Sequence, residues 1–162
     1  MTALAGKRSS APATRVLVLG FGNPGRQDDG LGPAVAAEIE KLDWPGVTAR
    51  DNYQLVLEDA LEIAENDVVW FVDAARDGAE PFGIQPLSSA PNIAFTSHLL
   101  RAEVLLAICQ NYFERAPQAF QVGIRGYDFE FQEGLTEGAQ RNLLEAVKFI
   151  QSSIGDMIGI EQ

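Results

Sequence analysis

Residues 16–42 constrain the fold most strongly, because they combine a buried strand, a glycine-rich turn and a helix in direct succession. Residues 16–19 form a continuous aliphatic run ended by Gly20, which is typical of a strand buried on both faces of a parallel sheet. We expect this strand to be the central one. Over residues 30–42, apolar residues recur at helical spacing with charged residues between them. A strand–turn–helix unit of this kind predicts an α/β protein.

Further strands are predicted at 47–51, at 68–72 and at 120–124. The run 68–72 is the strongest of these, and we expect it to end at Asp73. Residues 82–87, which are bounded by prolines, are expected to form an edge strand, where proline is tolerated.

Three further helices are expected between these strands. Ser97 is predicted to cap the second of them and Thr136 the last. Their expected apolar faces are Leu57, Ala60, Leu61 and Ala64, then Leu100, Val104 and Ile108, then Leu143, Leu144, Val147 and Ile150. Alternating strands and helices predict a single-domain three-layer α/β/α sandwich over residues 15–162 with a mostly parallel, twisted sheet, of the phosphorylase/hydrolase-like type. We expect residues 1–14 to be a flexible tail.

Composition excludes several classes of function. The net charge is −11 with 12 Lys and Arg residues, which argues against binding to nucleic acid or to an anionic membrane. Cys109 is the only cysteine, so neither an internal disulfide nor a multi-cysteine metal site can form. The sequence has no apolar run typical of a signal peptide or a membrane span. We therefore expect a cytoplasmic protein, and a monomer.

Two adjacent acids in the first turn give the main indication of function. A glycine-rich turn before a helix usually holds phosphate, because backbone N–H groups and the positive helix end attract anions. Asp28 and Asp29 lie in that turn, where they would repel a phosphate and attract a metal cation.

Two other residues are candidates for the same site. Asp73 follows a buried strand, at the edge of an α/β sheet where ligands bind, although it can equally be a helix cap or a partner for Arg76. His98 is the only histidine and lies at a predicted helix start, where the positive helix end favours neutral imidazole. A lone histidine is more often a surface residue. Together with two carboxylates, however, it would form an oxygen and nitrogen site suited to nickel or zinc.

Other catalytic signatures are absent. Cys109 lies among aliphatic residues and is expected to fill space in the core. A single histidine excludes H-E-x-x-H, and no G-x-S-x-G occurs. The hydrolytic candidates are therefore carboxylates.

Two alternatives to a metal site arise from the same turn. Residues 20–25 match G-x-G-x-x-G, and Asp51 can imitate the ribose-binding acid of a dinucleotide fold. That match is weak, because Asp28 and Asp29 lie where pyrophosphate would approach. Residues 19–25 also resemble the opening of peptidyl-tRNA hydrolases, but the threonine-arginine-histidine-asparagine segment that follows in that family is missing here.

Three separated motifs occur along the chain: Gly22-Asn23 with Asp28-Asp29-Gly30-Leu31-Gly32, then Phe71-Val72-Asp73-Ala74, then Thr96-Ser97-His98. In order and spacing they resemble the hydrogenase maturation endopeptidases. A later segment, Val122-Gly123-Ile124-Arg125-Gly126, with Thr136 opening the final helix, is similar to that family as well. The likeness therefore extends over nearly everything after the tail.

The resemblance implies a processing protease that removes the C-terminal extension of a [NiFe]-hydrogenase large-subunit precursor once nickel has been inserted. It also implies that Asp29, Asp73 and His98 recognise the nickel carried by the precursor, a site in which other divalent metals can substitute. Some relatives have glutamate where this chain has Asp29. Either a carboxylate or the metal would activate water for attack on the peptide bond, and Asp28 would be the base or merely a cap. A metal-binding chaperone or sensor that uses the same residues without cleavage is the remaining alternative.

Overall fold

The five strands form one sheet in the order β2-β1-β3-β5-β4. All neighbouring strands are parallel except β4 and β5, which are antiparallel. The computed structural model describes residues 13–89 and 101–160, so the predicted tail lies almost entirely outside the described residues. The strands are β1 (Val16–Phe21), β2 (Val47–Asn52), β3 (Val68–Ala75), β4 (Phe82–Leu87) and β5 (Gln118–Arg125).

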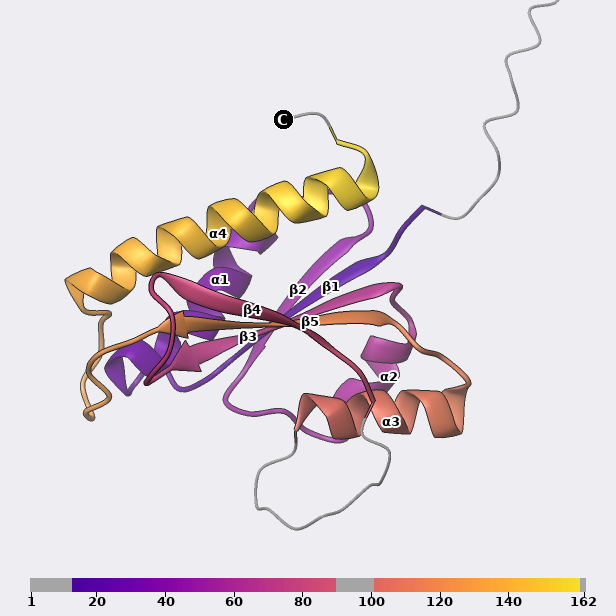
Figure 1. Ribbon diagram of the computed structural model, residues 1–162, viewed down its shortest axis with the longest axis horizontal. Helices are drawn as coiled ribbons and strands as arrows, with labels where there is room; N and C mark the ends of the chain where they lie inside the picture. Colours follow the sequence, from indigo (N-terminus) through magenta and orange to yellow (C-terminus); the bar gives the residue numbers. More distant parts are fainter. Residues whose placement is uncertain (1–12, 90–100, 161–162) are drawn as a thin grey trace, which may run out of the picture.

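Helices cover both faces of this sheet (Figure 1). α1 (Leu31–Glu40) and α4 (Glu137–Ile158) pack on one face, while α2 (Asp59–Ala64) and α3 (Ala102–Phe113) pack on the other. A short 3-10 helix, η1 (Gln27–Gly30), precedes α1. The predicted single-domain three-layer α/β/α sandwich with a mostly parallel sheet is therefore confirmed. In the described parts of the chain, the helices are too short or too polar to cross a membrane.

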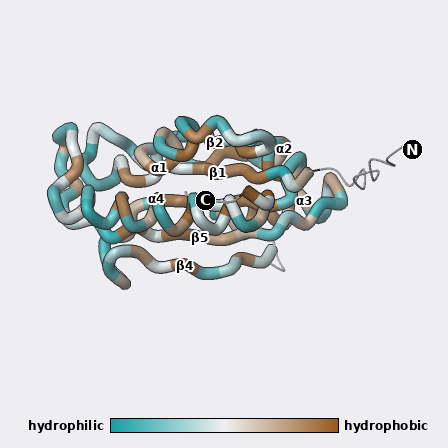
Figure 2. Tube along the Cα trace, turned by 90° about the horizontal axis from the view of Figure 1, so that it is seen from above, coloured by the Kyte–Doolittle hydropathy of each residue, from teal (hydrophilic) through white to brown (hydrophobic). Residues whose placement is uncertain are grey.

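Each sheet face has its own hydrophobic core, because alternate residues of a strand point to opposite faces. Val18, Trp70 and Ile150 belong to the core under α1 and α4, whereas Phe71 and Leu105 belong to the core under α2 and α3. The tube is brown along β1, whose first five residues are buried (Figure 2). β1 is thus an interior strand as expected, but the central position belongs to β3, which pairs with β1 and β5.

Two strand predictions have different outcomes. The edge strand at 82–87 is confirmed as β4. The expected end of β3 at Asp73 is wrong, because pairing with β5 continues from Asp73, opposite Gly123, to Ala75. Asp73 is consequently a residue within a strand and not a helix cap.

The buried faces of the helices differ from expectation more than the strand positions do. In α2, Ala60 and Ile63 are buried while Leu61 is exposed, and Leu57, which precedes the helix, is exposed as well. The side of this short helix that contains Ala60 contacts α3. Cys109 Sγ lies 3.3 Å from the carbonyl oxygen of Ala60 at that contact, which confirms its expected place in the core.

α3 and α4 also differ in part from expectation. α3 begins at Ala102 with Arg101 as its N-cap and buries Leu105 and Cys109, whereas Val104 and Ile108 of the expected face are only partly buried. Ser97 and Leu100 themselves lie outside the described residues. The predicted Thr136 cap of α4 is confirmed: its hydroxyl accepts a hydrogen bond from Ala139 N. α4 buries Ile150, as expected, but leaves Leu144 exposed. The buried side of this helix consists of Ala139, Asn142, Ala146, Ile150, Ile154 and Gly155.

Candidate functional site

Two glycines let the acidic turn lie directly on the carboxyl ends of β1 and β3. A Cβ at Gly20 would come within 2.0 Å of the carbonyl oxygen of Gly32, and one at Gly32 would lie 2.5 Å from the carbonyl oxygens of Phe21 and Val72. Any side chain at either position would push α1 away from the sheet. The close packing places η1, and with it Asp28 and Asp29, next to the end of β3.

Asp28 is fully buried and holds the turn to a distant part of the chain. Its carboxylate accepts hydrogen bonds from the backbone N–H groups of Tyr127 (2.7 Å), Asp128 (3.1 Å) and Thr136 (2.8 Å), and from the Thr136 hydroxyl (2.7 Å). Burial would raise the pKa of Asp28, but these bonds outweigh it and hold the pKa below its usual value. Of the two roles considered for Asp28, base or cap, this geometry favours a structural anchor.

Asp29 lies beside Asp28 but is only partly buried. Its Oδ2 accepts a hydrogen bond of 2.7 Å from the backbone N–H of Asn23. The backbone of Asp29 lies against Gly22, which has φ +141° and where a Cβ would come within 2.0 Å of the Asp29 carbonyl oxygen. One carboxylate oxygen of Asp29 is thus oriented by the turn, while the other accepts no hydrogen bond from the described part of the chain and is available to a ligand.

Asp73 lies near the carboxyl end of β3, close enough to Asp29 for the two carboxylates to repel each other. Burial raises the pKa of Asp73 to about 7, the negative charge of Asp29 adds to this rise, and hydrogen bonding from the Gln121 side chain partly offsets it. Two negatively charged carboxylates repel each other in a partly buried site. A bound cation would offset this repulsion and stabilise the ionised form of both.

Arg76, the alternative structural partner for Asp73, contacts a different residue. Its guanidinium stacks over the ring of Phe129, 4.2 Å from the ring centroid. Among the described residues, the ion pairs do not include Asp73. The structure therefore supports neither of the structural roles considered for this carboxylate.

His98 lies outside the described residues, so the proposed third member of the site stays a prediction. Asp29 and Asp73 are brought together at one edge of the sheet, as the sequence predicts. Within residues 13–89 and 101–160, no three His, Cys, Asp or Glu side chains are grouped so that they could hold a metal ion; His98 is not among these residues.

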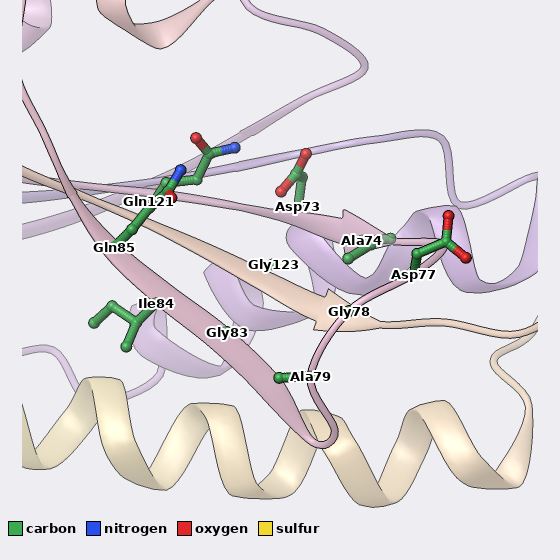
Figure 3. A pocket seen from close by; sticks show the side chains of 11 residues that line it. Asp73, Ala74, Asp77, Gly78, Ala79, Gly83, Ile84, Gln85, Gln121 and Gly123 are labelled. Carbon is green, nitrogen blue, oxygen red and sulfur yellow. The ribbon is translucent and has the colours of Figure 1, made fainter.

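A cleft of about 510 Å³ opens beside Asp73, on the sheet face that carries α2 and α3. Figure 3 shows the side chains of Asp73, Gln121 and Gln85 on one side of the strands, with Ile84 pointing to the other. The described residues that line the cleft come from β3, β4, β5 and the loop after β3: Asp73, Ala74, Ala75, Asp77, Gly78, Ala79, Gly83, Ile84, Gln85, Gln121 and Gly123.

Sequence reasoning missed Gln121 and Gln85 as parts of this site. Gln121 of β5 and Gln85 of β4 pair with each other. Gln121 lies two residues before Gly123, the residue that pairs with Asp73. A polar residue in a buried strand, two positions before a glycine, was the available signal. Only the strand register could show that Gln121 and Asp73 share a face.

Comparison with known proteins finds solved structures of similar fold. No family model and no curated protein matches the chain. A [NiFe] hydrogenase maturation protease HycI from Thermococcus kodakarensis superposes with a TM-score of 0.68 at 24% identity, covering 88% of this chain and 93% of that chain. The hydrogenase maturating endopeptidase HybD from E. coli has a TM-score of 0.71 at 18% identity, with the same two coverages.

A hydrogenase 2 maturation peptidase from a Thaumarchaeota archaeon is also similar. It superposes with a TM-score of 0.65 at 22% identity, covering 88% of this chain and 99% of that chain. Similarity that extends over most of both chains at such low identity is a likeness of fold. The chain therefore shares its fold with solved structures of hydrogenase maturation proteases.

Proposed function

We propose that this chain is an endopeptidase that removes the C-terminal extension of a [NiFe]-hydrogenase large-subunit precursor after nickel insertion. The observation that carries the proposal is the convergence of Asp29 and Asp73 at one sheet edge, close enough for the charge of Asp29 to raise the pKa of Asp73. The fold shared with HycI and HybD supports the same conclusion. The single free cysteine, which is buried, is compatible with activity in the cytoplasm.

In this proposal nickel arrives as part of the substrate. Asp29, Asp73 and His98 would supply two oxygens and one imidazole nitrogen, a set suited to a borderline divalent ion such as nickel, and other divalent metals would bind there as well. Holding the precursor's metal would fix the nearby peptide bond relative to the protein, which lowers the entropic part of the barrier.

The chain's own residues orient the two carboxylates and supply a candidate base. The Asn23 N–H orients Asp29, and β3 together with Gln121 orients Asp73. Asp28 holds the turn that carries Asp29 in place and does not contact the substrate, because four hydrogen bonds already occupy its carboxylate. A carboxylate of the site or the metal would activate the attacking water. Asp73 is the better carboxylate candidate, since a base with a pKa near the working pH is the most effective.

The test is cleavage of a purified, nickel-loaded precursor, followed by intact mass spectrometry. We expect the wild-type protein to shorten the precursor, and Asp29→Asn, Asp73→Asn and His98→Ala to slow this by about 100-fold or more. Asp51→Asn, an exposed acid on β2, is the control and should process normally.

Two outcomes would refute the proposal. One is a wild-type protein that leaves every nickel-loaded precursor intact. If it nevertheless bound those precursors, the non-proteolytic chaperone or sensor would be the better explanation. The other is normal processing by folded Asp29→Asn and Asp73→Asn variants, which would separate the cleavage from this pair of carboxylates.

A further inference from the structure

Asp73, Gly123 and Gly83 form one continuous row across three neighbouring strands. Asp73 of β3 pairs with Gly123 of β5, which pairs in turn with Gly83 of β4. All three belong to the sheet face that carries α2 and α3, since Trp70, Val122 and the other residues alternating with them pack in the opposite core. The row begins at the candidate site and ends at β4, the outermost strand on that side of the sheet.

The two glycines leave this row without side chains, so it forms a channel in the sheet surface. Gln121 and Gln85 flank the channel on one side, because each lies two residues along its strand from Gly123 or Gly83. Asp77 lies on the other flank (Figure 3). Ala75 of β3, two residues beyond Asp73, lines the cleft together with Asp77 and the two glutamines. Two strand spacings make the channel about 10 Å long, which is the length of about three extended residues.

Neither backbone conformation nor packing requires a glycine at position 83. Gly83 and Gly123 have no positive φ, in contrast to Gly22 and Gly78. A Cβ at Gly83 would meet no described atom within 4 Å, and one at Gly123 would only touch the Ala75 Cβ at 3.3 Å. Glycine weakens a strand, and where no turn or close contact requires it, it often marks a place where a ligand or another backbone approaches closely.

The chemistry of the channel suits a peptide backbone. The side-chain amides of Gln85 and Gln121 each offer donors and an acceptor, which matches the alternating N–H and C=O groups of an extended chain. Asp73 and Asp77 are the charged groups among the described lining residues, and no Lys or Arg is among them. Acidic side chains in the occupant would therefore be repelled.

We propose that the row Asp73–Gly123–Gly83 is the binding channel for about three extended residues of the hydrogenase precursor on one side of the scissile bond, and that it selects against acidic side chains there. This inference rests on the proposed function and adds its substrate specificity. The substrate backbone lies over the two glycines, and the metal-bearing end of that segment lies at Asp73.

The decisive experiment enlarges the side chain at position 83 in steps. We expect Gly83→Ala to reduce kcat/KM for a nickel-loaded precursor moderately and Gly83→Val to reduce it by about 10- to 100-fold, mainly through a higher KM. Valine suits a strand, so both variants should keep the wild-type melting temperature. Leu144→Phe is the control, because it adds bulk at an exposed position of α4, the helix on the other face of the sheet, and it should cleave normally.

A second measurement tests the charge selectivity from the substrate side. Glutamate is placed in turn at each of the three precursor positions before and after the scissile bond. We expect slower cleavage for substitutions on one side only, with partial recovery when the enzyme carries Asp77→Asn. Equal effects on both sides, or no recovery, would overturn the charge selection.

The remaining outcomes separate this inference from the proposed function. If the wild-type protein and Gly83→Val cleave equally well, the channel is wrong and the proposed function stands. If Gly83→Val lowers the melting temperature as well as cleavage while Leu144→Phe does neither, the protein's own chain fills the space, and the channel is again wrong. If the wild-type protein cleaves no nickel-loaded precursor, the proposed function fails and its substrate channel with it.

Discussion

Replacing Asp28 by asparagine should destabilise the protein strongly, although it removes only a charge. Three donors converge on Oδ2 and a fourth on Oδ1. An asparagine amide must turn its NH₂ group toward at least one of these donors, whichever way it is flipped. A hydrogen bond to a charged group contributes about 1.5–3 kcal/mol, and a buried donor left unpaired costs about 1–3 kcal/mol. We expect a loss of about 3 kcal/mol in the free energy of unfolding at pH 7.

The loss should also depend on pH in a defined direction. The folded-state pKa of Asp28 is lowered from its ordinary value of 3.8, so its stabilising effect is complete above that value and disappears as the pH falls through the folded-state pKa. The stability difference between wild type and Asp28→Asn should be constant from pH 7 to about pH 5 and should shrink at lower pH.

Urea denaturation followed by circular dichroism from pH 3 to pH 7 measures this difference. Asp51→Asn, at an exposed site on β2, is the control and should stay within about 0.5 kcal/mol of wild type. A cost below about 1 kcal/mol at pH 7, or a difference that grows as the pH falls, would refute the assignment of Asp28 as a charged anchor.

Three further predictions concern single groups. Thr136→Val should cost about 2 kcal/mol, because it loses the hydrogen bond to Asp28 and the cap of α4; Thr136→Ser should restore most of it, and a double-mutant cycle with Asp28→Asn should be non-additive. In the metal-free protein, NMR titration should give Asp73 a pKa of about 7. Asp29→Asn should lower that pKa, and since it is raised above 3.8, stability should fall as the pH rises toward 7; an unchanged value in Asp29→Asn would contradict the proximity of the two carboxylates. Burial raises the pKa of Cys109, so the folded protein should resist iodoacetamide, and Cys109→Ala should retain processing activity; rapid alkylation under native conditions would show that the thiol is accessible.

The sequence determined the features that depend on near neighbours along the chain. The aliphatic run of β1, the prolines around β4 and the Thr136 cap are local patterns, and each predicts its element because a few adjacent residues set its conformation. The candidate pair Asp29 and Asp73 could also be predicted, since the carboxyl ends of parallel strands meet at one edge of a sheet.

The tertiary structure decided whatever depends on distant partners. The apolar residues of α2 and α3 allow more than one buried face, and contact between the two helices selected the one around Ala60 and Cys109. The role of Asp28 depends on donors about one hundred residues away along the chain. The row from Asp73 to Gly83 exists only because β3, β5 and β4 pair in one particular register. Register and helix contacts are set by the packing of the whole core, and no local pattern contains that information.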